Sequence, residues 1–316
     1  MNNVAPIIVL VYNRFEHFKK CIGSLQENAL SSESVIYIVS DAASTPEDEI
    51  AVNQIREFAL SITGFKEKKY LFRKKNLGAH DSCDEAIKEV LSENDSFIIL
   101  EDDIFVAPNF LRYMNDGLLF YKNDYNIFSI CGFKLPFALP PVYNKEVYFY
   151  PGISPWGFAT WKERWESVNF GYENRYAKLK EDKKMYKKFL SIGFYIKGIL
   201  IADSKQEIVA GDLRIYYHMF KNNMASVFPI VSKSQNWGYD GSGLHCGNKN
   251  AFWAKPSLDM TNQQINFIPF TGFDEVLLKN HRRYSDKING GIFAKYLKYT
   301  WVHDIYKYIR KISHMK

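Results

Sequence analysis

Short apolar runs alternate with segments of helical periodicity over the first 110 residues. Uninterrupted apolar runs of this length are typical of strands that are buried on both faces of a parallel sheet. A strand–helix alternation predicts an α/β domain with right-handed crossovers and a nucleotide-type crevice at the carboxyl ends of the strands. The expected strands cover residues 6–12, 35–40, 69–73 and 97–100, and the expected helices cover 14–28, a segment that starts at 46, and 81–91.

The pattern is less regular after Asp103. We expect an exposed lysine-rich segment at 178–188 and a loop at 233–250, where Gly, Ser and Asn are frequent. No internal repeat or low-complexity linker divides the chain, so we expect one domain at 1–278 and a tail at 279–316. The other expected elements are helices at 109–121 and 211–222 and strands at 127–133, 147–150 and 227–232.

Three consecutive carboxylates follow the apolar run at 97–100: Glu101, Asp102 and Asp103. Ligands of open α/β sheets bind outside the carboxyl ends of such strands. Neighbouring acids repel one another, so a cation would stabilise them there. Carboxylate oxygens suit Mg²⁺ or Mn²⁺, which also bind substrate phosphates. The triplet therefore indicates a metal site, and the alternative is a solvated acidic loop.

The net charge of +6 belongs to the tail. Residues 279–316 contain ten Lys and Arg and two Asp, whereas residues 1–278 contain 31 basic and 33 acidic side chains. A nucleic-acid-binding body would carry basic residues along a groove, so nucleic acid is not an expected partner. At 316 residues and 47% hydrophobic, the chain can form one large core or two smaller ones.

Four scattered cysteines without paired spacing indicate a reducing compartment and argue against a disulfide framework or a zinc site. The first apolar run is too short for a signal peptide, and no run reaches the ~18 apolar residues of a membrane span. We therefore expect a cytoplasmic protein.

The tail carries an imperfect amphipathic stripe. One interpretation is a helix that lies on the anionic inner face of the plasma membrane, near a lipid-linked acceptor. The alternative is a C-terminal helix that packs on the domain and exposes its charged face. The apolar members recur at steps of three and four residues: Phe293, Leu297, Trp301, Ile305, Ile309 and Ile312.

Several stretches together resemble a known family. The stretch EDDIFVAPNFLRYM at 101–114 resembles the acid motif of nucleotide-sugar glycosyltransferases with the GT-A fold, and especially the inverting N-acetylglucosaminyltransferase I family. The opening PIIVLVYNR at 6–14 is similar to bacterial family-two-type transferases. YPGISPWGFATW at 150–161 resembles an acceptor-side loop, and 211–220 with 228–243 resembles a catalytic helix and a closing loop. The resemblance spans roughly residues 5–245.

The resemblance implies a role for each matching residue. The Asn-x-Gly turn of Asn76 and Gly78 would close over the nucleoside, and Trp156 would contact the acceptor. Asp103 would bind Mn²⁺ or Mg²⁺ on the diphosphate, with His245 as a further ligand from the late loop. Asp212 would be the general base. The remaining donor contacts would come from Asn13, Arg14 and Asp41 to the base and ribose, and from Glu101 and Asp102 to the ribose and donor sugar.

Each residue also has a structural interpretation. Asp41 and the segment at 76–78 suit ordinary turns. Asp212 suits a helix N-cap. Tryptophans such as Trp156 are more often core residues than sugar platforms, and a lone histidine such as His245 usually has another role.

The implied function is inverting transfer of a sugar from a nucleotide diphosphate sugar, with uracil as the expected base. The expected acceptor is a glycan or a lipid-linked oligosaccharide of cell-surface polysaccharide synthesis. Alternatives are a retaining transferase and a non-catalytic nucleotide-sugar-binding or scaffold protein on the same fold. A nucleotidyltransferase is disfavoured, because the first strand–helix junction, YNRFEH, lacks the glycine of a phosphate loop.

Overall fold

The computed structural model describes residues 4–242 and 251–289. These residues form two compact units. The first comprises the described residues up to Lys134 together with Asn144–Ser167 and Ala225–Thr271. The second comprises Leu135–Tyr143, Val168–Met224 and the described residues from Gly272 onward. Each unit has its own secondary-structure class: the first is built on a sheet, and the second is helical.

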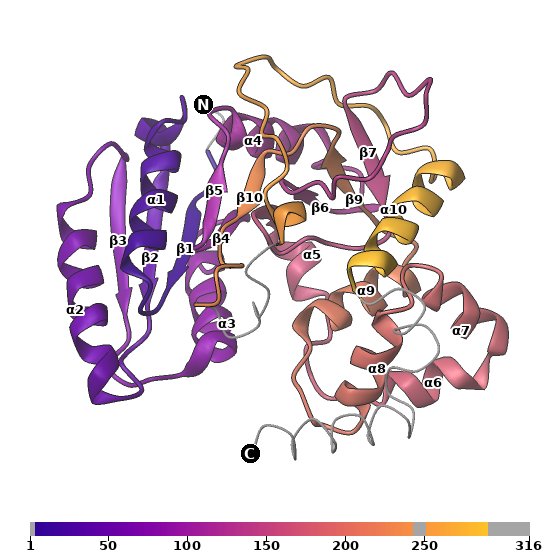
Figure 1. Ribbon diagram of the computed structural model, residues 1–316, viewed down its shortest axis with the longest axis horizontal. Coiled ribbons are helices and arrows are strands. Elements are labelled where there is room, and N and C mark those ends of the chain that lie inside the picture. Colours follow the sequence, from indigo (N-terminus) through magenta and orange to yellow (C-terminus); the bar gives the residue numbers. More distant parts are fainter. Residues whose placement is uncertain (1–3, 243–250, 290–316) are drawn as a thin grey trace. The chain divides into compact units, whose positions relative to one another are not determined.

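The first unit contains an eight-stranded sheet in the order β3-β2-β1-β4-β8-β6-β9-β7 (Figure 1). The strands β3, β2, β1 and β4 run parallel to one another. Strand β8 is antiparallel to both β4 and β6, β6 is parallel to β9, and β7 is antiparallel to β9. The bounds are β1 Ile7–Val11, β2 Val35–Ser40, β3 Glu67–Phe72, β4 Ser96–Glu101, β6 Ile127–Cys131, β7 Val147–Tyr150, β8 Phe158–Trp161 and β9 Ala225–Pro229.

Helices cover both faces of the parallel part of this sheet. From β1 to β2 to β3 the sheet grows in one direction, and β4 is then added on the opposite side of β1. Because each crossover is right-handed, α1 and α2 lie on one face of the sheet and α3 lies on the other. Strands β1 and β4 are consequently buried on both sides, as their apolar runs predict. The helices of this unit are α1 Phe15–Gln26, α2 Pro46–Ser61, α3 Gly78–Leu91, α4 Phe110–Phe120, α5 Lys162–Glu166, and the short η1 Ser31–Glu33 and η2 Phe252–Ala254.

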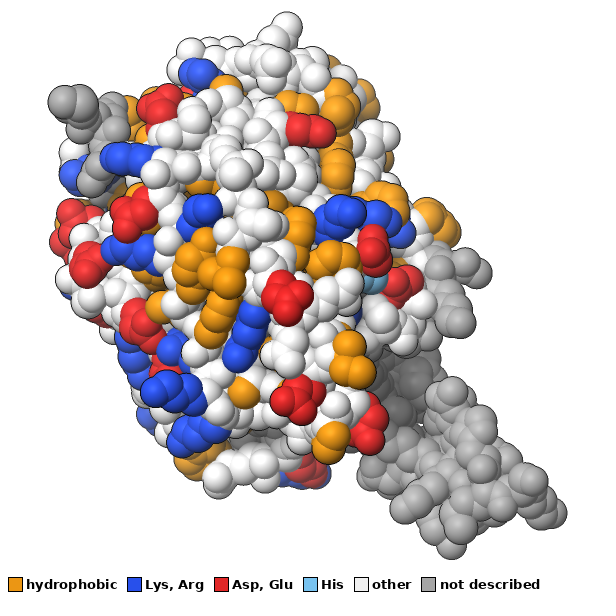
Figure 2. Space-filling model, turned by 90° about the vertical axis from the view of Figure 1, so that its left-hand side faces the viewer, with side chains coloured by type: hydrophobic (Ala, Val, Ile, Leu, Met, Phe, Trp, Pro, Cys, Tyr) orange, Lys and Arg blue, Asp and Glu red, His pale blue; other side chains and the backbone are white. Residues whose placement is uncertain are grey.

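The outer strand β3 carries charged side chains in its first half. Lys68 and Lys69 lie on this edge strand, where charge opposes pairing with another sheet. Figure 2 views the molecule from the side of α2 and β3 and shows Lys and Arg mixed with Asp and Glu on that face. Charges of one sign do not dominate the face, which agrees with the near-neutral balance of residues 1–278.

A second, two-stranded sheet lies next to the acid triplet. Strand β5 (Ile104–Val106) pairs antiparallel with β10 (Ser234–Asn236), and Ile104 lies opposite Asn236. This pairing brings the segment after β10 to the carboxyl end of β4. A buried ion pair of Lys233 with Asp259 precedes β10, with Lys233 fully buried.

The second unit contains five helices among its described residues. A buried cluster joins three of them: Asp203 of α8 lies 3.0 Å from the Arg214 guanidinium of α9 and 3.7 Å from that of Arg175 in α6. Asp203 and Arg175 are each about 1% exposed. The bounds are α6 Arg175–Glu181, α7 Lys183–Leu190, α8 Ile196–Ser204, α9 Gly211–Lys221 and α10 Glu275–Ile288.

The α/β class and the parallel order of the first four strands confirm the sequence prediction. Strand β6 ends at Cys131, before the predicted residue 133, although the Gly132 N–H still donates to the Gly157 carbonyl at 2.8 Å. Strand β9 is shifted toward the N-terminus of the predicted 227–232 and ends at Pro229. The sequence prediction missed α8, whose buried residues alternate as in a strand.

The lysine-rich segment at 178–188 folds as parts of α6 and α7. Asp182 lies between the two helices, and its carboxylate caps α7 by accepting hydrogen bonds from the N–H groups of Lys184 and Met185. The predicted boundary between 278 and 279 falls inside α10, so a separate tail stays a prediction. The tail stripe from Phe293 onward lies outside the described residues. Among the described residues, no helix has the length and apolar character that crossing a membrane requires.

Candidate functional site

The acid triplet lies where β4 ends. Glu101 is the last residue of β4 and is exposed, whereas Asp102 and Asp103 form the turn into β5 and are only 3% and 4% exposed. Two adjacent buried carboxylates require compensation, because burial of an unpaired charge is strongly unfavourable. The turn between β4 and β5 therefore concentrates negative charge at the edge where the sheet predicts a ligand.

The Arg14 guanidinium compensates both buried carboxylates. Its Nη1 lies 2.9 Å from Asp103 Oδ2, and its Nη2 and Nε donate to the carboxylate of Asp102. Arg14 occupies the junction between β1 and α1, so two neighbouring strand ends bring these charges together. Burial raises the pKa of Asp102 to about 6, and the positive charge of Arg14 opposes that rise.

The segment that follows β10 covers the acid pair. The backbone N–H of Trp237 donates to the Asp103 carbonyl at 2.8 Å. At Gly238 an added Cβ would lie 2.1 Å from Asp103 Oδ2, so the backbone rests directly on this carboxylate. Asp240 then pairs with His17 Nε2 at 3.1 Å. We call residues 237–240 the covering loop.

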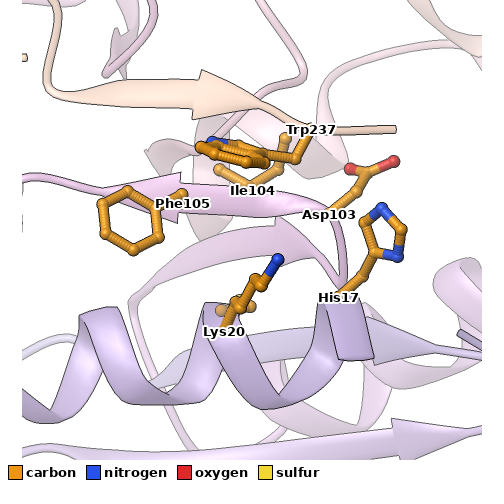
Figure 3. A pocket seen from close by; sticks show the side chains of 7 residues that line it. His17, Lys20, Asp103, Ile104, Phe105 and Trp237 are labelled. Atoms are coloured by element: carbon orange, nitrogen blue, oxygen red, sulfur yellow. The ribbon is translucent and has the colours of Figure 1, made fainter. Parts of the chain in front are cut away.

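A small hollow opens beside Asp103, lined by α1, β5 and the covering loop (Figure 3). His17 and Lys20 project from α1 toward Trp237, and the His17 ring faces the Asp103 carboxylate (Figure 3). The Lys20 and Lys255 ammonium groups lie 5.3 Å and 3.9 Å from the centre of the Trp237 ring. These cation–π contacts hold Trp237 of the covering loop between α1 and the residue that follows η2.

The donor atoms of this site fit a divalent cation held jointly with a substrate. Asp103 Oδ1 is buried without a hydrogen-bond partner, which leaves one carboxylate oxygen for a metal. Among the described residues, no group of three or more His, Cys, Asp or Glu side chains could hold a metal. Further ligands would then come from phosphate and water, as Mg²⁺ and Mn²⁺ commonly accept. The predicted ligand His245 lies outside the described residues.

The predicted nucleoside contacts form a second cluster at the ends of β2 and β3. The Asp41 carboxylate accepts hydrogen bonds from the N–H groups of Leu77 at 3.0 Å and Gly78 at 2.8 Å. The Asn76 amide donates to the Ala42 carbonyl at 2.7 Å. Gly78 has φ +79°, which favours glycine. Asp41 thus orders the turn at 76–78, in agreement with its structural interpretation. A contact of Asp41 with a nucleotide stays a prediction.

The Asn13 side chain forms a hydrogen bond with Asp48 in the first turn of α2. Its amide donates to Asp48 Oδ1 at 2.7 Å, and the Tyr12 hydroxyl donates to Asp48 Oδ2 at 2.8 Å. These hydrogen bonds lower the pKa of Asp48, with the bond from Asn13 as the largest cause. Asn13 and Arg14 are neighbours in sequence but have different partners, so the predicted nucleotide contacts divide into two clusters.

Aromatic rings gather around Trp156 on the same unit. The Trp156 ring centre lies 4.4 Å from Phe133, 5.8 Å from Tyr239 and 5.6 Å from Trp253, with which it stacks. Trp156, Tyr239 and Trp253 keep part of their surface in solvent. Tyr239 belongs to the covering loop, so this aromatic cluster adjoins the acid pair through the chain.

Trp161 is buried in the core, and Trp165 is half-buried. Trp161 is 7% exposed, and its ring centre lies 3.6 Å from the guanidinium carbon of Arg164. Trp165 packs against Phe97 and Phe158 in the sheet. Their structural interpretation therefore holds.

Asp212 is the second residue of α9, in the second unit. Its side chain reaches solvent, yet the protein atoms around it desolvate the carboxyl and raise its pKa. The N-cap position is Ala210, so Asp212 does not cap this helix. The predicted N-cap alternative is wrong, because the helix begins one residue before Asp212. Nearby, the Arg214 guanidinium donates to the carbonyl of Phe170 and to Asp203, which anchors the first turn of α9.

Sequence reasoning missed His17, Gly238 and Asp240 as site residues. His17 follows Arg14 by three positions, and residues three apart share a helix face, so its approach to the acids could have been expected. Gly238 and Asp103 are far apart in sequence, so no local sequence pattern predicts their contact.

Comparisons with known proteins find a family match in the N-terminal part of the chain. Residues 7–135 match the family model described as Glycosyl transferase family 2. The chain is similar to the mannosyltransferase PcManGT from Pyrobaculum calidifontis, solved in complex with GDP-Man and Mn²⁺, with 15% identity and a TM-score of 0.36 over 51% of this chain and 45% of that one. It is also similar to S. aureus TarS, with 13% identity and a TM-score of 0.40 over 72% of this chain and 36% of that one.

A further similarity is to an active-site mutant of LgtC, with 12% identity and a TM-score of 0.35 over 70% of this chain and 72% of that one. The chain spans less than half the length of PcManGT and of TarS. No curated protein sequence matches the chain. The match to Glycosyl transferase family 2 covers residues 7–135, which is less than half of the chain.

Proposed function

We propose that this protein is a metal-dependent inverting glycosyltransferase. It moves a sugar from a UDP-linked donor to a hydroxyl of a glycan or a lipid-linked oligosaccharide in cell-surface polysaccharide synthesis. The observation that carries the proposal is the buried pair Asp102 and Asp103 at the carboxyl end of β4, with Asp103 Oδ1 left without a hydrogen-bond partner. A diphosphate with a divalent cation would supply that missing partner.

Each cluster of the first unit would take one part of the donor. The turn at 76–78 and the side chains of Asp41 and Asn13 would contact the base and ribose. Glu101 and Asp102 would contact the ribose and donor sugar, and Asp103 would hold Mn²⁺ or Mg²⁺. The cation would stabilise the negative charge that develops on the departing diphosphate.

The acceptor hydroxyl must lose its proton while its oxygen attacks the anomeric carbon. The oxygen–carbon bond forms as the bond from that carbon to the diphosphate breaks, which inverts the configuration. We propose that the Asp212 carboxylate accepts the proton, because it reaches solvent, has a raised pKa and is free of a capping role. Trp156, with Tyr239 and Trp253, would offer ring faces to an acceptor sugar.

The basic tail would place the enzyme at the inner face of the plasma membrane. This proposal rests on the ten Lys and Arg within residues 279–316 and on the apolar stripe of the same segment. Co-sedimentation of the full chain with anionic vesicles is expected, and a chain that ends at residue 289, after α10, should lose it. Equal binding by both chains would remove this role from the tail.

A thermal-shift screen tests donor binding. UDP, GDP, CDP and dTDP are each added to the protein with and without Mn²⁺. A ligand that binds the native state raises the melting temperature, and we expect this for UDP with Mn²⁺. Asp103→Ala should abolish the metal-dependent part of the shift. The absence of a shift with every nucleotide would favour a non-catalytic scaffold instead.

A transfer assay tests the proposed base and acceptor contact. With donor and acceptor glycans, Asp212→Asn should lower kcat by at least about a hundredfold, which is typical of removing a general base. The UDP-dependent thermal shift should persist in this variant. Trp156→Ala should raise KM for the acceptor and leave KM for the donor unchanged. Normal turnover in Asp212→Asn would exclude this residue as the base.

A further inference from the structure

Arg14 engages three of the four carboxylate oxygens of the acid pair. Its guanidinium contacts both oxygens of Asp102 through Nη2 and Nε, and Asp103 Oδ2 through Nη1. The Arg14 side chain is 18% exposed, against 4% for Asp102 and 3% for Asp103. The positive charge of this buried site is thus already supplied by the chain itself.

The surroundings hold this arrangement in place. An added Cβ at Gly238 would lie 3.1 Å from Arg14 Nη1 and 2.1 Å from Asp103 Oδ2, so the covering loop touches both members of the ion pair. The loop is fastened by Asp240 to His17 and by the Trp237 backbone N–H to the Asp103 carbonyl. The guanidinium and the loop occupy Asp103 Oδ2, so a cation would have to bind Oδ1 of the same carboxylate, next to the positive charge of Arg14.

We propose that Arg14 is an exchangeable counter-ion of the Asp102–Asp103 pair, which a divalent cation must displace before it binds Asp103. Two positive groups at one carboxylate repel each other strongly in a partly buried site. The guanidinium must therefore move away, and the cost of that movement weakens cation binding to the empty protein.

This proposal deepens the proposed function and rests on it, because it assigns Arg14 a role at the same metal site. A freed guanidinium would remain next to the acid pair, and its planar fork matches phosphate geometry. The diphosphate would then offer Arg14 a new anionic partner at the moment when the metal takes Asp103. Cation binding would become tight in the presence of a diphosphate and stay weak without it.

The test measures Mn²⁺ binding to the full-length protein without nucleotide, by electron paramagnetic resonance of free Mn²⁺ at low ionic strength. Arg14→Met removes the charge and keeps a long apolar side chain, and Arg14→Lys keeps the charge. We expect Arg14→Met to bind Mn²⁺ at least about tenfold more tightly than the wild type, because one nearby positive charge is gone. Arg14→Lys should bind Mn²⁺ about as weakly as the wild type.

A second pair of variants guards against misfolding of a site with two uncompensated acids. Asp102→Asn retains the pairing of Arg14 with Asp103. The double variant Asp102→Asn with Arg14→Met removes one negative and one positive charge, so Asp103 loses its partner while the net charge of the site stays as in the wild type. The double variant should bind Mn²⁺ at least about tenfold more tightly than Asp102→Asn. Circular dichroism and melting curves verify that both are folded.

The outcomes separate this proposal from the proposed function. Tighter Mn²⁺ binding in both comparisons, abolished by adding Asp103→Asn, supports Arg14 as the counter-ion. Equal affinity with and without the guanidinium, or no Mn²⁺ binding by any folded variant, overturns it. Neither result depends on a nucleotide or on turnover, so failure of the donor screen leaves this measurement interpretable.

Discussion

The contact between the covering loop and Asp103 makes a sharp prediction for Gly238→Ala. A Cβ at this position would lie 2.1 Å from Asp103 Oδ2, 3.0 Å from Asp103 Cγ and 3.1 Å from Arg14 Nη1. Ordinary Cβ contacts to heavy atoms exceed 3.0 Å, so the loop or the carboxylate must move by about 1 Å. Neither moves freely, because Arg14 holds the carboxylate and Asp240 holds the loop.

The expected cost follows from overpacking. Forcing one methyl group into a filled site typically destabilises a protein by about 1–3 kcal/mol. We therefore expect the Gly238→Ala protein to unfold at a lower urea concentration than the wild type, with a loss of unfolding free energy in this range. The matched control is Gly23→Ala in α1, where an added Cβ meets no atom within 4 Å. Replacing a helix-interior glycine should stabilise the protein by roughly 0.5–1 kcal/mol.

A double-mutant cycle identifies the cause. Asp103→Ala removes the two nearest atoms that the new methyl group would meet. In that background, Gly238→Ala should cost less than about 0.5 kcal/mol, since the two closest contacts of the new methyl group are gone. Urea unfolding followed by circular dichroism measures all four proteins. If Gly238→Ala is as stable as Gly23→Ala, or if its cost persists without the Asp103 side chain, the covering loop does not rest on this carboxylate.

Two further predictions concern buried ion pairs. Burial alone would raise the pKa of Asp259, but hydrogen bonds from Lys233, Thr261 and Asn109 outweigh it, with that from Lys233 the largest, and lower this pKa to about 2. A folded-state pKa below the unfolded value of about 3.9 stabilises the protein above that pH, and the contribution disappears as the pH falls through about 2. Lys233→Met should therefore destabilise strongly at pH 7 and much less at pH 2.5, and a gap in urea midpoint that is independent of pH would contradict the pairing. In the second unit, Asp203→Asn should cost about 3–5 kcal/mol, because it leaves the buried Arg214 guanidinium without its carboxylate. The exposed Glu207→Gln should change stability by less than about 0.5 kcal/mol, and equal effects of the two substitutions in thermal unfolding would refute the importance of the buried cluster.

Local pattern was sufficient for the fold of the N-terminal half. Strands buried on both faces have continuous apolar runs, and the helices between them have an apolar stripe of period 3.6. Both kinds of element can therefore be predicted from short segments of the sequence. The residue that ends each strand also defines the ligand edge of a parallel sheet. For this reason the triplet at 101–103 was identified as a site candidate from its place at a strand end, whereas Asp41 became a candidate through the family resemblance.

Pattern was misleading where packing overrides local preference. The sequence analysis assigned no element to residues 196–204, yet this segment forms α8. The first turn of α9 begins one residue before Asp212, which removes the capping role that residue type alone suggested. Such details depend on tertiary contacts, including the burial of Arg214 against Asp203.

By itself, the sequence determined the strand–helix order, the parallel sheet and the position of three acids at its ligand edge. These features follow from hydrophobic periodicity, which reports burial along a continuous segment. Only the tertiary structure decided which groups meet those acids. Arg14 and Gly238 are separated from Asp103 by 89 and 135 positions, and charge compensation or steric contact over such separations leaves no local signature. The pairing of β5 with β10 and of β1 with β4 creates these contacts, because it sets chain segments side by side that the sequence keeps far apart.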